Sequence, residues 1–231
     1  MREVLLSGKT SFKIEVPHKL IESGEREKEK PLIVYLHGFN QNIVQFQGLV
    51  EELLDLEAYH LFIQGPYPIY DRRQKKKVKH WGRSWYLYDG EQDQFVKSLE
   101  LSSEFIQEVI DNILDQINVS RIALLGYSMG GYQAGYFALS RWKHVNDLVV
   151  IGGRIKTELF EDRKKHYDHL NVLALHGAGD KSVDSNPQKE CCKQLLRWNA
   201  SVTFKELEES HALSSLFLQE AKKWFKSIGY N

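Results

Sequence analysis

A glycine–serine–glycine turn between a buried strand and a small-residue helix constrains this chain more than any other feature. Residues 126–130 read G-Y-S-M-G, after an apolar strand expected at 121–126 and before a helix expected at 130–141. Glycines on both sides of the serine permit a strained strand-to-helix turn that lifts Ser128 above the edge of a sheet. Ser128 is therefore a candidate nucleophile. The alternative is a turn that merely contains serine.

Strand and helix patterns alternate along most of the chain. Strands are expected at 32–36, 60–64, 121–126, 147–151, 171–175 and 201–207. Helices are expected at 43–56, from 100 to 117, and at 130–141, 186–198 and 211–228. This order predicts an α/β fold with a mostly parallel central sheet and helices on both faces. An antiparallel hairpin of residues 4–6 and 12–16 is expected at the N-terminus.

Residues 65–90 interrupt the alternation of strands and helices. They show no helical or strand periodicity and are expected to form a loop. The 231 residues, 42% of them hydrophobic, otherwise suit one domain, 1–231, with a sizeable core. A loop this long is usually functional or mobile. It leaves the 60–64 strand on the rim that carries Ser128, so Trp85 and Tyr86 are expected to line the substrate pocket. The alternative is a surface loop that is held together by its own aromatic side chains.

Charge and cysteine usage exclude several classes of function. Lys+Arg and Asp+Glu are 31 each, so no whole-molecule field favours nucleic acid or an anionic membrane. No stretch has the pattern of a leader or a membrane span, and the neighbouring Cys191 and Cys192 are poorly placed to pair with each other. These features predict a cytoplasmic protein. Metal-ligand spacing and nucleotide-binding glycine motifs are missing from the sequence, so no metal or cofactor is expected.

An acid and a base follow later strands in the order that serine hydrolysis needs. Asp180 lies just past the 171–175 strand, and His211 follows the 201–207 strand and is expected to open the last helix. A serine hydroxyl becomes a good nucleophile when a histidine takes its proton and a carboxylate orients that histidine. Alone, Asp180 reads as a turn former and His211 as a helix-start residue. Together they predict a triad, with Asp180 rather than Asp184 as its acid.

The segment H-G-F-N-Q, residues 37–41, supplies the remaining requirement of acyl transfer. Two backbone N–H groups must point at the oxygen that becomes negative in the transition state. Met129, directly after the nucleophile, is expected to provide one and Phe39 the other. Gly38 lets the backbone turn inward there, and the Phe39 side chain can line the acyl pocket.

As an ordered set these motifs resemble the α/β-hydrolase superfamily, and within it the small, lidless carboxylesterases and phospholipase/thioesterase-like enzymes. Only about twenty residues separate the 147–151 strand from the next, too few for an inserted cap. The resemblance implies Ser128 as nucleophile, His211 as base, Asp180 as orienting acid, and no cofactor. Two residues depart from the relatives: Met129 stands where Gln is common, and Ser210 where Gly often precedes the histidine.

The sequence thus predicts a hydrolase of small-molecule esters or thioesters with short to medium acyl chains. An amidase, peptidase or acyltransferase would use the same triad, and a ligand-binding protein on a retired hydrolase fold belongs to another class. The sequence leaves open whether the chain acts as a monomer or a homodimer.

Overall fold

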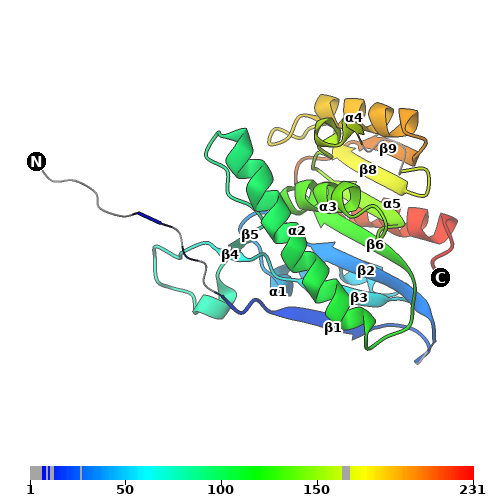
Figure 1. The fold of residues 1–231 in the computed structure, drawn as a ribbon. Coiled ribbons are helices and arrows are strands. Elements are labelled where there is room, and N and C mark those ends of the chain that lie inside the picture. Colours follow the sequence, from blue (N-terminus) through cyan, green and yellow to red (C-terminus); the bar gives the residue numbers. More distant parts are fainter. Residues whose placement is uncertain (1–6, 9, 11–12, 27, 163–166) are drawn as a thin grey trace, which may run out of the picture.

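The chain folds around one twisted sheet that is covered by helices on both faces (Figure 1). The structure is a computed structural model and describes residues 7–8, 10, 13–26, 28–162 and 167–231. Within these residues the strand order of the large sheet is β1-β3-β2-β6-β7-β8-β9. Adjacent strands run parallel except β1, which is antiparallel to β3. The α/β fold with a mostly parallel sheet is confirmed.

The elements have the following bounds. The large sheet contains β1 (His18–Glu22), β2 (Lys30–Leu36), β3 (Tyr59–Ile63), β6 (Val119–Tyr127), β7 (Asp147–Ile151), β8 (Asn171–Gly177) and β9 (Ser201–Leu207). A small antiparallel pair consists of β4 (Tyr67–Pro68) and β5 (Arg83–Ser84). The helices are α1 (Ile43–Leu49), α2 (Gln92–Leu114), α3 (Met129–Ser140), α4 (Ser185–Arg197) and α5 (Ser215–Ser227). Short 3-10 turns are η1 (Glu51–Leu53), η2 (Val78–His80) and η3 (Thr157–Leu159).

The core has two halves, one on each face of the sheet. Along β2, Leu32, Val34 and Leu36 pack in the half that contains residues of α2, α3 and α4. The intervening Ile33 and Tyr35 pack in the half that contains residues of α1 and α5. Because both faces of β2 are buried, its sequence is a continuous apolar run rather than an alternating one.

Three predicted helices differ from the observed ones. The helix expected at 43–56 ends after Leu49, and the chain tightens into η1, where the N–H of Leu53 bonds the carbonyl of Val50. The helix α2 begins at Gln92, eight residues before the expected position 100. Its first three residues are exposed and polar, but Phe95 and Leu99 are buried four residues apart, a helical spacing that the prediction overlooked. The last helix begins at Ser215 rather than at His211.

The late start of α5 has a local cause. Before it, the N–H of Glu209 bonds the carbonyl of Leu207, and the carbonyl of Glu209 accepts from Gly179. The bond from Gly179 holds residue 209 against the loop after β8, and the carbonyl of His211 accepts the hydroxyl of Tyr127 rather than a helical N–H. His211 therefore lies in a loop at the edge of the sheet.

The predicted N-terminal hairpin cannot be followed throughout. Its first arm, residues 4–6, lies outside the described residues, as do residues 11 and 12. Residues 13–16 of the second arm have no regular secondary structure. The antiparallel pairing at this edge comes from β1, whose register aligns His18 with Ile63 of β3.

Candidate active site

Ser128 occupies a strained turn between β6 and α3. Its φ of 52° and ψ of −117° are unusual for a residue with a side chain, and such conformations cluster at functional sites. A Cβ at Gly126 would come within 2.2 Å of the carbonyl oxygen of Gly130, and one at Gly130 within 2.0 Å of that of Leu36. Neither position can hold a larger residue without moving the backbone, so both glycines are needed for this turn.

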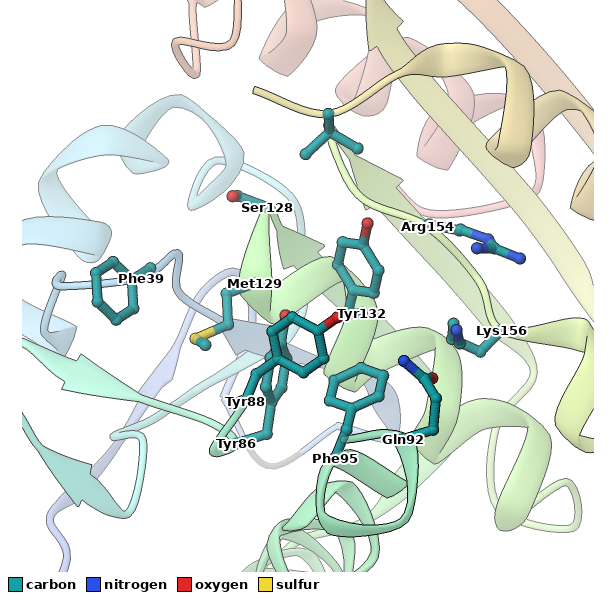
Figure 2. A pocket seen from close by; sticks show the side chains of 11 residues that line it. Phe39, Tyr86, Tyr88, Gln92, Phe95, Ser128, Met129, Tyr132, Arg154 and Lys156 are labelled. Carbon is teal, nitrogen blue, oxygen red and sulfur yellow. The ribbon is translucent and has the colours of Figure 1, made fainter. Parts of the chain in front are cut away.

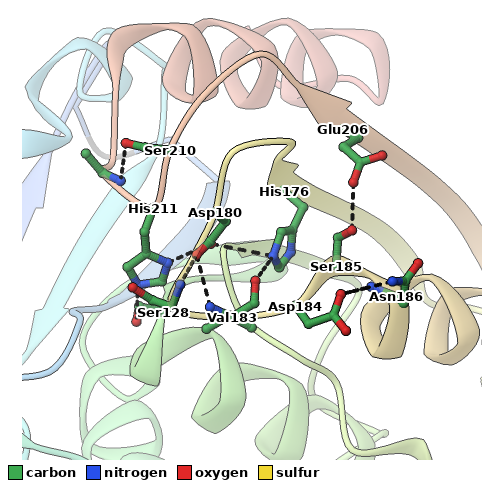
Figure 3. A network of polar contacts seen from close by, with 12 residues as sticks. Ser128, His176, Asp180, Val183, Asp184, Ser185, Asn186, Glu206, Ser210 and His211 are labelled. Atoms are coloured by element: carbon green, nitrogen blue, oxygen red, sulfur yellow. Dashed lines mark hydrogen bonds and ion pairs between the residues drawn. The ribbon is translucent and has the colours of Figure 1, made fainter.

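The three residues predicted as a triad form one chain of hydrogen bonds (Figure 3). His211 Nε2 lies 2.9 Å from Ser128 Oγ, and His211 Nδ1 lies 2.7 Å from Asp180 Oδ2. Because an ionised carboxylate can only accept, Nδ1–H is the donor to Asp180. The lone pair of Nε2 is then left to accept the proton of Ser128 Oγ.

Asp180 is held in place by the backbone of its own loop. Its Oδ1 accepts the N–H groups of Ser182 and Val183 at 2.8 and 3.0 Å, while Oδ2 faces His211. Burial disfavours the charged form, but the hydrogen bonds from His211, Val183 and Ser182 outweigh it and lower the pKa of Asp180. The buried His176 donates from Nε2 to the carbonyl of Val183, which fixes the same loop.

Tyr127, which the sequence did not single out, fixes the backbone at His211. Its hydroxyl donates to the carbonyl of His211, and the two rings lie 5.6 Å apart. Since Tyr127 directly precedes the serine, one residue at the end of β6 ties the loop of the base to the turn of the nucleophile. The only sequence signal that could have identified Tyr127 as a site residue was its position at the end of a predicted strand.

His37 organises the loop that carries Phe39. Its Nε2 accepts the N–H of Gly65 at 3.0 Å, so Nδ1 carries the proton and donates to the carbonyl of Gly38 at 2.8 Å. Burial lowers the pKa of His37 to about 4, which keeps the ring neutral and in this tautomer near pH 7. The two bonds fix the backbone on both sides of the ring.

The prediction for Trp85 needs correction. Trp85 is fully buried and does not line the cavity at Ser128. Its Nε1 donates to the carbonyl of His37 at 2.8 Å, and its ring centroid lies 5.1 Å from that of His37. A buried indole requires a hydrogen-bond partner, and here that partner lies in the loop after β2. Trp85 therefore stabilises the loop after β2 and does not line the cavity.

Phe39 and Met129 lie beside Ser128 in the lining of the same cavity. Neither backbone N–H bonds an acceptor within the part of the chain that the structure describes. Each N–H group therefore keeps its capacity to donate a hydrogen bond. The Met129 sulfur accepts the N–H of Trp85 at 3.5 Å and lies 3.3 Å from Ser84 Oγ. Through these contacts the thioether of Met129 connects α3 to the 65–90 loop.

A cavity of about 440 Å³ opens next to Ser128 (Figure 2). Tyr86 lines it, in the position the sequence predicts, and Phe39 lies at its side with 60% of its surface exposed. The other lining residues are Tyr88, Gln92, Phe95, Met129, Tyr132, Arg154, Lys156 and Val183. Met129 was predicted as a donor, but most of the others were missed because they come from helices or from the segment after β7, where the sequence carries no motif.

Two further observations concern the described residues. No group of three His, Cys, Asp or Glu side chains there is arranged to hold a metal ion. None of the helices in the same residues combines the length and the apolar character needed to cross a membrane.

The chain is similar to known proteins along most of its length. A family described as phospholipase/carboxylesterase matches residues 17–228. Lysophospholipase-like protein 1 of Mus musculus is 23% identical over 207 residues, which cover 83% of this chain and 84% of that protein. A shorter match is 41% identical over 51 residues to 2-hydroxy-6-oxononadienedioate/2-hydroxy-6-oxononatrienedioate hydrolase of Cupriavidus pinatubonensis. It spans 22% of this chain and only 18% of that enzyme.

A solved structure shares the fold. The carboxylesterase of Bacillus cereus superposes with a TM-score of 0.71 at 19% identity, over 92% of this chain and 94% of the other. At this identity the likeness establishes the arrangement of strands and helices.

Proposed function

Because the chain belongs to the phospholipase/carboxylesterase family and is thus an esterase-type hydrolase, we propose that it cleaves carboxylic esters or thioesters through an acyl-enzyme on Ser128. The observation that carries this proposal is the unbroken hydrogen-bonded chain from Ser128 through His211 to Asp180, beside a cavity lined largely by aromatic side chains. A nucleophile, a base and an orienting acid in contact are what acyl transfer by serine requires.

In the first half of the reaction Ser128 Oγ attacks the ester carbonyl while its proton moves to His211 Nε2. The carboxylate of Asp180 stabilises the resulting imidazolium through the 2.7 Å bond to Nδ1. The carbonyl oxygen becomes negative and is stabilised by the N–H groups of Phe39 and Met129. His211 then protonates the departing alcohol or thiol.

In the second half a water molecule takes the place of the leaving group. His211 accepts a proton from this water, whose oxygen attacks the acyl carbon bound to Ser128. The same two N–H groups stabilise the second tetrahedral intermediate. When it collapses, His211 returns a proton to Ser128 Oγ and the free acid leaves.

The size of the cavity supports short to medium acyl chains. About 440 Å³ bounded by aromatic side chains accommodates a small acyl group. The segment after β7 contains η3 and no inserted helical cap in its described residues, so little apolar surface is available to cover a long chain. With para-nitrophenyl esters from acetate to palmitate, kcat/KM should be highest at short or medium length. Saturable activity with palmitate alone would contradict this.

A fluorophosphonate probe tests the chemistry separately from the substrate. Such a probe phosphonylates an activated serine, so it should label the folded protein at neutral pH and leave Ser128→Ala unlabelled. A ligand-binding protein on the same fold would remain unlabelled in both forms. Product analysis with added alcohols distinguishes hydrolysis from acyl transfer.

A further inference from the structure

The cavity beside Ser128 has a cationic side that the proposed hydrolysis does not use. Arg154 and Lys156 line it, and among the described residues no acidic side chain does. Figure 2 shows these two residues on one side of the cavity and Ser128 and Met129 on the other. A neutral acyl group needs only the aromatic lining between them, so the two cations call for a separate explanation.

The segment that carries both cations packs against the backbone of the nucleophile's turn. They follow β7 and the pair Gly152-Gly153, where a Cβ at Gly153 would come within 2.9 Å of the carbonyl oxygen of Ser128. Between them, Ile155 is fully buried against α3, since a Cβ at Gly135 would lie 3.1 Å from its Cα. Its N–H donates to the buried Gln188. Because Ile155 anchors this segment in the core, its two neighbours are left to line the cavity.

Within the described residues, Arg154 and Lys156 have one acidic ion-pair partner between them. Glu158 Oε1 lies 2.8 Å from Arg154 and 3.0 Å from Lys156, so one carboxylate is shared by two cations. The Nε of Arg154 is buried and has no hydrogen-bond acceptor within the described part of the chain.

Lys156 also has an apolar surrounding that favours an anionic partner. Its side chain is only 12% exposed, and its Nζ lies 5.6 Å from the ring centroid of Phe95. A partly desolvated ammonium binds an anion more strongly than one in bulk water, because the surrounding dielectric is lower. Phe95 and Tyr132 offer apolar contact along the same cavity.

We propose that the substrates are esters in which the part that fills this cavity is apolar and ends in a carboxylate, which Arg154 and Lys156 bind. This inference rests on the proposed function, because it assigns a substrate class to the same Ser128 site. The carboxylate can belong to the acid side of the ester, as in a monoester of a dicarboxylic acid. It can equally belong to the alcohol side, as in an acylated hydroxy acid, and the two sources require separate probes.

The test compares pairs of esters that differ in one charge. On the acid side the pair is para-nitrophenyl hydrogen adipate and para-nitrophenyl hexanoate. On the alcohol side it is para-acetoxyphenylacetate and para-acetoxyphenylacetamide. The ratio of kcat/KM for the charged over the neutral ester should exceed one in at least one pair, with the difference mainly in KM. It should fall by about tenfold in Lys156→Gln, the size expected for one charge-assisted hydrogen bond.

Two variants serve as controls. Lys97→Gln removes the same charge from an exposed position on α2 that does not line the cavity, and it should leave the ratio as in the parent. Lys156→Arg keeps the charge and should keep most of the preference. Added sodium chloride should lower the ratio in the parent, since salt screens the attraction.

The outcomes separate the two proposals. Hydrolysis of all esters with ratios of one or below in both pairs would overturn this inference alone. If the ratio of kcat/KM fell equally in Lys97→Gln and Lys156→Gln, this inference would also be overturned, because the effect would then be one of overall charge. Failure to hydrolyse any ester, with no labelling of Ser128, would overturn the proposed function and this inference with it.

Discussion

Replacing Asp180 by asparagine should disable His211 by turning its imidazole into the wrong tautomer. The Oδ1 atom of Asp180 accepts two backbone N–H groups, from Ser182 and Val183. In the variant the amide oxygen must keep that position, since an amide nitrogen cannot accept from them. The NH₂ group then faces His211 Nδ1, which has to become an acceptor. The proton moves to Nε2, where it blocks transfer from Ser128.

The expected loss in kcat is about 10⁴, as for the same substitution in other serine triads, or about 5.5 kcal/mol in activation free energy. Asp184→Asn is the matched control four residues away. Asp184 is exposed, caps α4 by accepting the N–H of Asn186, and contacts no residue of the triad. Asparagine caps helices as well as aspartate does, so this variant should keep kcat within a few-fold and its stability.

The assay is para-nitrophenyl acetate hydrolysis at neutral pH, with fluorophosphonate titration to count active sites. Thermal unfolding followed by circular dichroism shows that both variants are folded. If Asp180→Asn retains kcat within about tenfold of the parent, Asp180 does not orient the base. A larger loss in Asp184→Asn than in Asp180→Asn would assign the acid to the other residue.

Two further predictions concern Phe39 and the buried histidines. Phe39→Pro removes a backbone donor and should lower kcat on acetate esters by about 10²–10³. Phe39→Ala keeps the donor and should mainly raise KM for apolar acyl groups. A folded Phe39→Pro with parental kcat would contradict the assignment of Phe39 as an oxyanion donor. Burial lowers the pKa of His37 and His60 from 6.5 to about 4, so the unfolded chain binds more protons between these values. The free energy of unfolding should therefore fall as pH drops from about 6.5 to 4, by up to about 1.4 kcal/mol per pH unit for each ring. Urea denaturation at a series of pH values measures this, and a constant value from pH 6.5 to 4.5 would refute it.

The triad candidates could be found from the sequence because each stands at a predictable place. Ser128, Asp180 and His211 follow β6, β8 and β9 at the carboxyl edge of a parallel sheet, where ligand-binding residues of such sheets gather. The strands can be predicted from continuous apolar runs. Such runs are needed because both faces of the sheet are buried. Chain order and sheet topology together therefore bring distant residues to one edge.

The cavity could not be predicted in the same way. Trp85 and Tyr86 are neighbours in one aperiodic loop, yet the first is buried behind His37 and the second lines the cavity. Which aromatic ring faces the substrate depends on how the loop packs, and no local pattern encodes that. Arg154 and Lys156 were missed because their role depends on the burial of Ile155 between them.

The glycines at residues 126–130 also determine how the two proposed oxyanion donors, Phe39 and Met129, are placed relative to each other. The missing side chain of Gly130 lets α3 approach the carbonyls of Leu36 and His37, to which a Cβ would come within 2.0 and 2.6 Å. These carbonyls immediately precede Gly38 and Phe39, while Gly130 immediately follows Met129. One close contact between backbones thus fixes the segments that carry both N–H groups. The motif at residues 126–130 and the segment at 37–41 therefore act as one structural unit, although about ninety residues separate them in the chain.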